Sequence, residues 1–121
     1  MLFRSLGVCV APPHLWVMQE TVSEVFTFLA ERKKLFYVYV WDIDMDYERG
    51  KDGLDFGPGE KQLPRPDGAL DWSVLLRNLA ATGYSGVASL KCHGTHGWPL
   101  DYVTRQLAAS AAYVRSCMPK G

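Results

Sequence analysis

The sequence predicts an α/β protein built from three parallel β/α units. Along its 121 residues, three short apolar runs alternate with three stretches in which apolar residues recur at helical spacing. Strands that alternate with helices in this way are joined by crossover connections, which make neighbouring strands parallel. We therefore expect strands over 5–11, 35–41 and 86–92, and helices over 20–33, 72–82 and 99–117.

The first unit begins with the apolar run over 5–11, which ends at the two prolines that follow Ala11. In the next helix, Thr21 and Glu24 have the spacing of a capping box, in which the hydroxyl and the carboxylate satisfy free backbone N–H groups. One face of this helix is apolar and is expected to cover the sheet. Its residues are Val22, Val25, Phe26 and Leu29.

The second strand, 35–41, is rich in aromatic and β-branched residues, and its two faces differ. Alternation places Phe36, Val38 and Val40 on one face, and Tyr37, Tyr39 and Trp41 on the other. The other two strands also have one face of small or polar residues, such as Cys9 and Lys91. A single layer of helices leaves this second face bare, so we expect a barrel interior, a partner chain or further sequence to cover it.

The third unit follows a long polar stretch over 42–70, a length of loop that is often functional. Asp71 is the expected N-cap of the next helix, and Gly83 its C-terminal stop. Pro99 suits the first turn of the last helix.

Composition excludes several classes of partner. Thirteen basic residues balance thirteen acidic ones, which argues against a nucleic-acid or anionic-membrane surface. No apolar run approaches the roughly 18 residues of a membrane span. The N-terminus carries no secretory pattern, and three widely spaced cysteines fit a reducing compartment, so we expect a cytoplasmic protein.

Five stretches in this order resemble the C-terminal part of the xylose-isomerase-like superfamily of TIM barrels, the sugar-phosphate isomerases and epimerases. The stretches are 7–14, 36–42, 57–60, 70–72 and 83–91. They correspond to the family's last three strands with their loops. The resemblance implies that 1–121 is a single, incomplete β/α-barrel segment.

The resemblance also implies a divalent metal held by two Glu, one Asp and one His, with proton exchange beside a sugar carbonyl. In this chain the positions of the Asp, the His and the final Glu hold Ala11, Tyr39 and Lys91. The first Glu would lie upstream of Met1. Since alanine has no donor and a protonated lysine repels a cation, we predict no metal at this site, no other cofactor, and no isomerase activity of the isolated chain.

The candidate catalytic residues are His14, Asp42 and Lys91. His14 keeps the residue type of a family position that often contacts substrate, and Asp42 follows a strand at the end where such barrels place their chemistry. Lys91 is either a base or Schiff-base amine, or an ion-pair partner of a carboxylate such as Asp42, which we favour. The candidate substrate-binding residues are His14, Tyr39, Trp41 and His93.

Two clusters resemble metal sites in part. Asp42, Asp44, Asp46 and Glu48 are spaced like the start of a Ca²⁺ loop, but the glycine and the final Glu of that signature are missing. The stretch 92–96 brings one cysteine and two histidines together without a fourth zinc ligand at a recognised spacing. We interpret both as ordinary loops.

Three functions remain open at this stage. The first is a segment resembling a sugar or sugar-phosphate isomerase or epimerase, with a sugar or sugar phosphate as partner. The second is a non-catalytic binding or assembly module that docks a partner through the open sheet, whether the missing barrel portion or a second copy. The third is an enzyme with metal-free chemistry around His14, Asp42 and Lys91.

Overall fold

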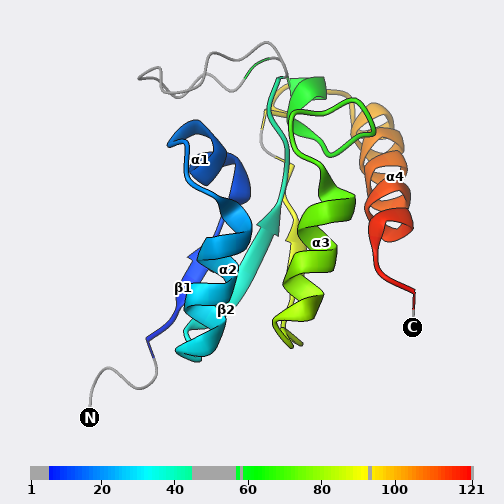
Figure 1. The fold of residues 1–121 in the computed structure, drawn as a ribbon. Helices are drawn as coiled ribbons and strands as arrows, with labels where there is room; N and C mark the ends of the chain where they lie inside the picture. Colours follow the sequence, from blue (N-terminus) through cyan, green and yellow to red (C-terminus); the bar gives the residue numbers. More distant parts are fainter. Residues whose placement is uncertain (1–5, 45–56, 58, 93, 121) are drawn as a thin grey trace.

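The computed structural model describes residues 6–44, 57, 59–92 and 94–120 (Figure 1). Three strands form one parallel sheet in the order β1-β2-β3, as the sequence predicts. They are β1 (Val8–Val10), β2 (Leu35–Val40) and β3 (Ala88–Leu90). The two outer strands are shorter than expected, whereas β2 and the helices lie close to their expected places.

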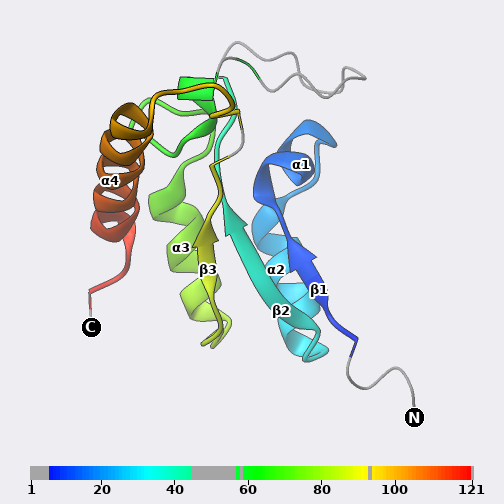
Figure 2. The same ribbon diagram turned by 180° about the vertical axis from the view of Figure 1, so that it is seen from behind.

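The helices are α1 (Pro12–Val17), α2 (Val22–Glu31), α3 (Trp72–Ala81) and α4 (Leu100–Cys117), with a short 3₁₀ helix, η1 (Gly59–Gln62). Helices α2 and α3 lie across one face of the sheet, and α4 packs beside α3 (Figure 1). Seen from behind, the three strands lie in front of these helices (Figure 2). The described residues therefore form two layers, with one sheet face left open.

Helix α1 is an α-helix that the sequence did not predict, and η1 lies in the stretch that was expected to be a loop. The first two residues of α1 are Pro12 and Pro13, which are both buried. Proline fits the first turn of a helix because its missing N–H has no partner there and its φ is already helical. The prolines that end the first strand therefore also begin a helix.

The two helices of the covering layer begin differently. The Asp71 carboxylate accepts a hydrogen bond from the Val74 N–H at 3.2 Å, which confirms the predicted cap of α3. Gly83 has a φ of +81° just beyond the end of that helix, which fits its expected role as the stop. The capping box predicted for α2 is wrong, because the Thr21 side chain makes no capping hydrogen bond.

The main core lies between the sheet and helices α2 and α3. Its fully buried members include Val38 and Val40 of β2, Phe26 of α2 and Trp72 of α3. Phe36 does not join them, contrary to the predicted alternation, and is 47% exposed. The register between β1 and β2 shifts near this residue, and its ring lies so close to Gly7 that an added Cβ would fall 2.1 Å from Cγ.

The burial of Trp41 shows that the second face of the sheet is not bare along its whole length, as was expected for Tyr37, Tyr39 and Trp41. The Trp41 side chain is 0% exposed and packs with Ile43 in a second cluster. That cluster also takes in Ala11, Trp16, Val17, Tyr39 and Ala69. The unpredicted helix α1 thus helps to cover Trp41, and the open part of the aromatic face is limited to the half-buried tyrosines. Among the described helices, none is both long and apolar enough to cross a membrane.

Candidate functional site

Four of the predicted site residues meet at the carboxyl end of the sheet. The rings of His14 and Trp41 lie edge to face, with centroids 5.2 Å apart. The Lys91 ammonium lies 5.0 Å from the centre of the Trp41 ring and 5.6 Å from that of Tyr39. We call these four residues, His14, Tyr39, Trp41 and Lys91, the aromatic mouth.

Strand geometry explains why these side chains meet. Tyr39 lies in β2 opposite Ser89 of β3, and the Lys91 N–H donates to the Val40 carbonyl at 2.9 Å. Since side chains two residues apart share a face, Tyr39 and Trp41 point to the same side. His14 joins them from α1.

The members of the mouth differ in exposure, which sets what a ligand can touch. His14 is exposed, Tyr39 and Lys91 are half-buried, and Trp41 is fully buried beneath them. The ammonium over two rings is a cation–π arrangement. Tyr37 extends the aromatic surface along β2, with its ring centre 5.0 Å from that of Tyr39.

Asp42 lies apart from the mouth, although it directly follows Trp41. Its side chain is 0% exposed. Its carboxylate accepts hydrogen bonds from the Ile43 N–H at 2.8 Å, the Leu70 N–H at 3.2 Å and the Trp72 indole N–H at 3.3 Å. The favoured Asp42–Lys91 ion pair is therefore wrong, and among the described residues the Lys91 ammonium forms no ion pair at all. The burial of Asp42 also corrects its interpretation as part of an ordinary acidic loop.

Burial raises the pKa of Asp42 from its ordinary value of 3.8 to about 6. The three hydrogen bonds and the positive charge of Arg65 act in the opposite direction and lower the pKa. The loss of hydration outweighs them because the carboxylate has no contact with solvent. The Asp42 carboxyl therefore keeps its proton to a higher pH than an exposed aspartate does.

The remaining sequence candidates lie partly outside the described residues. His93, Asp46 and Glu48 lie outside the described residues. Cys92 and His96 are both exposed. Within the described ranges, no three His, Cys, Asp or Glu side chains gather closely enough to hold a metal ion.

The divalent metal that the resemblance implies does not fit the residues at the corresponding positions. Ala11 offers no donor atom, and Lys91 brings an ammonium where the resemblance implies a carboxylate. Tyr39, at the histidine position, has its ring beneath that ammonium. A divalent cation at this place would meet positive charge and aromatic carbon instead of the oxygen ligands that it prefers.

Gln62 is a structural residue of the site that the sequence did not reveal. It is buried, its carbonyl accepts from the Asp42 N–H at 2.9 Å, and its side-chain amide donates to the Gly57 carbonyl at 2.7 Å. Nearby, a Cβ on Gly59 would lie 2.2 Å from the Gly94 carbonyl oxygen. In the sequence, only Gly59 and Gly94 hinted at this contact. Glycines without a Cβ allow the loops after β2 and β3 to approach each other closely.

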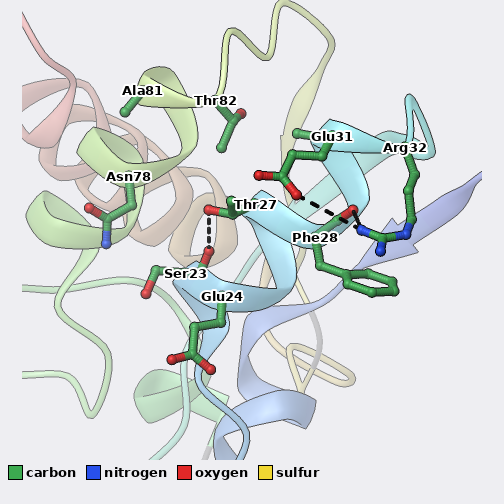
Figure 3. A pocket seen from close by; sticks show the side chains of 10 residues that line it. Ser23, Glu24, Thr27, Phe28, Glu31, Arg32, Asn78, Ala81 and Thr82 are labelled. Carbon is green, nitrogen blue, oxygen red and sulfur yellow. Dashed lines mark hydrogen bonds and ion pairs between the residues drawn. The ribbon is translucent and has the colours of Figure 1, made fainter.

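Two surface grooves lie away from the mouth. The larger, of about 750 Å³, lies between α2 and α3 and is lined largely by polar side chains (Figure 3). There the Thr27 hydroxyl donates to the Ser23 carbonyl at 3.0 Å, and Arg32 reaches Glu31 at 4.0 Å (Figure 3). The smaller groove, of about 520 Å³, is lined by the first residues of β2 and by residues that precede β2 and β3, including Lys33 and Tyr84. Neither groove contains a member of the mouth.

No protein-family model, curated protein or solved structure matches this chain. The likeness to xylose-isomerase-like barrels therefore stays a prediction. The geometry of the mouth is the observation from which a function can be proposed.

Proposed function

We propose that the chain is a segment of a xylose-isomerase-like β/α barrel whose aromatic mouth binds a sugar or sugar phosphate in the cytoplasm. The observation that carries the proposal is the meeting of Tyr39, Trp41 and Lys91 at the carboxyl end of a parallel sheet. Ligands of parallel β/α folds bind at this end, because the loops that follow the strands surround it.

The chemistry of the mouth suits such a ligand. The half-buried ring of Tyr39 offers a flat apolar surface to the C–H face of a sugar, and its hydroxyl can form a hydrogen bond, while the buried Trp41 supports this ring and Lys91 from below. The Lys91 ammonium supplies three donors for phosphate or hydroxyl oxygens. The exposed imidazole of His14 supplies a further donor or acceptor at the rim.

The same geometry supports binding rather than the family's isomerisation. Ala11 and Lys91 stand where the family has metal ligands. A metal-free catalytic group of His14, Asp42 and Lys91 is weakened as well, since the Asp42 carboxylate is held by Leu70 and Trp72. The Lys91 ammonium instead faces the aromatic rings.

Calorimetric titration tests the proposal with three ligands: a ketose phosphate, the free ketose and inorganic phosphate. We expect the ketose phosphate to bind best. Lys91→Met should weaken its binding about 10- to 100-fold, the value of one charge-assisted hydrogen bond. The matched control is Lys120→Met, because Lys120 is exposed beyond α4.

Three outcomes would contradict this proposal. They are the absence of binding at millimolar ligand, equal effects of the Lys91 and Lys120 substitutions, and stoichiometric Mn²⁺ or Mg²⁺ binding that is lost in His14→Ala. The last outcome would restore the metal-dependent enzyme.

A second candidate function, a non-catalytic assembly module, is favoured by the open sheet face. Figure 2 shows a side of the sheet where no described helix covers the strands. Cys9 and Tyr37 are register partners that alternate with the buried Val10 and Val38, and Cys9 is exposed and Tyr37 half-buried. Such a face would dock the remaining units of a barrel, and isolated copies would pair through it. Sedimentation velocity should show association that Tyr37→Lys abolishes and Thr104→Lys, on the exposed side of α4, preserves. A monomer at all concentrations would rule this candidate out.

A further inference from the structure

Two adjacent side chains at the end of β2 are buried on opposite sides of the strand. Trp41 lies beneath the other members of the aromatic mouth, with its ring centre 5.0 Å from the Lys91 ammonium. Asp42 is buried against the chain that leads into α3. Because one peptide bond joins the two residues, whatever holds the backbone at Asp42 also limits where the Trp41 ring can lie.

Hydrogen bonds hold Asp42 through both its backbone and its side chain. Its N–H donates to the Gln62 carbonyl at 2.9 Å. One carboxylate oxygen, Oδ1, accepts from the N–H groups of Ile43 and Leu70, and the other, Oδ2, accepts from the indole N–H of Trp72. These partners belong to the next residue, to the loop after β2 and to the beginning of α3, so they fix the end of β2 from several directions.

The segment that Asp42 holds also contacts the Trp41 side of the strand. Gly68 and Leu70 lie against the carboxylate, since a Cβ on Gly68 would fall 2.2 Å from Oδ2 and Leu70 donates its N–H to Oδ1. Ala69, between them, packs against the buried cluster that contains Trp41. The carboxylate that holds residues 68 and 70 therefore also holds Ala69 against that cluster.

We propose that Asp42 is a positioning residue of the aromatic mouth, whose carboxylate fixes the Trp41 ring beneath the Lys91 ammonium through the segment 68–70 and the backbone of β2. Asp42 acts on a ligand only through Trp41 and Lys91. Its consequence for binding rests on the proposed sugar or sugar-phosphate site. The position of the ring, in contrast, can be measured without any ligand.

Asparagine at this position tests the carboxylate with little change in volume. The three groups that face the side chain are all N–H donors, whereas an amide has one acceptor oxygen and one NH₂ group that only donates. In one orientation the NH₂ group would meet the Trp72 indole, and in the other the N–H groups of Ile43 and Leu70. Since a buried donor without an acceptor is costly, Asp42→Asn should displace the segment 68–70.

NMR on the full chain measures the result. In the wild type, an NOE should connect the Trp41 ring to the Lys91 methylene beside its ammonium. In Asp42→Asn this NOE should be lost, while the hydrogen-exchange protection of the Val38 amide in the middle of β2 stays high. Asp71→Asn is the matched control, because it makes the same chemical change nearby and asparagine caps a helix as well as aspartate does.

Gly68→Ala perturbs the same contact and leaves Asp42 in place. Its Cβ would fall 2.2 Å from Oδ2, so this variant should lose the same NOE. Calorimetric titration with the ketose phosphate supplies the functional readout. Both variants should weaken its binding about 10-fold, the value of about one hydrogen bond, and Asp71→Asn should not change it.

The proposal fails on any of three results. One is an unchanged NOE in folded Asp42→Asn, because a loss of stability alone would mean that Asp42 only supports the fold. Another is an equal loss of the NOE in Asp71→Asn. The third is an NOE that persists in Gly68→Ala, which decides the matter even if Asp42→Asn does not fold. If the wild type binds no ketose phosphate, the proposed function fails, whereas the NOE comparison still decides the positioning role.

Discussion

The two faces of the sheet differ in what they contribute. On the face beneath α2 and α3, Val38 and Val40 are fully buried. On the open face, Tyr37 and Tyr39 are half-buried and Cys9 is exposed. The same central strand thus supplies core contacts on one side and polar, aromatic chemistry on the other. Stability and ligand contact should therefore be separable by substitution.

The largest expected effect lies on the covered face. Phe26→Ala should lower the free energy of unfolding by about 3–5 kcal/mol, because Phe26 is 1% exposed in the main core. Phe28→Ala, on the same helix, should cost only about 1 kcal/mol, because Phe28 is 54% exposed and its ring lies under the Arg32 guanidinium at the surface. Urea denaturation of both variants measures the difference. Similar losses would mean that the outer side of α2 is covered as well.

Intermediate effects distinguish the two helices of the covering layer. Asp71→Ala should cost about 1 kcal/mol, since it removes the hydrogen bond to the Val74 N–H at the beginning of α3. Thr21→Ala should cost less than about 0.5 kcal/mol, because its hydroxyl caps nothing in α2. Thermal unfolding followed by circular dichroism compares the two. A larger loss for Thr21 would show that the capping box forms in solution.

The smallest effect is expected on the open face. Cys9→Ser should change the free energy of unfolding by less than about 0.5 kcal/mol, because this thiol is exposed. Denaturation at two protein concentrations checks this. A loss above about 2 kcal/mol, or one that grows at higher concentration, would show that a second copy buries the face.

Features set by near neighbours were predictable from the sequence. Because side chains alternate between the two faces of a strand, the sequence predicted that Tyr39, Trp41 and Lys91 share one face. The structure brings these three side chains together. Asp71 was identified as a cap from its position before an apolar run, because the hydrogen bond it makes spans only three residues. Such signals need no knowledge of the rest of the fold.

Other features depended on what lies opposite in space. Trp41 was expected on a bare face, yet α1 helps to cover it. The sequence could not reveal this helix, because a pair of prolines is compatible both with the end of a strand and with the beginning of a helix. Asp42 was expected to meet Lys91, but its partners come from the segment that packs over β2.

The sequence by itself therefore determined the parallel β/α order, the faces of β2 beyond Phe36 and the cap of α3. Each of these depends on bonds and alternation within a few residues. Only the tertiary structure decided that Trp41 and Asp42, which are adjacent in the chain, are buried on opposite sides against different partners. The physical reason is that burial and pKa are set by the atoms that surround a side chain, and these come from distant parts of the chain.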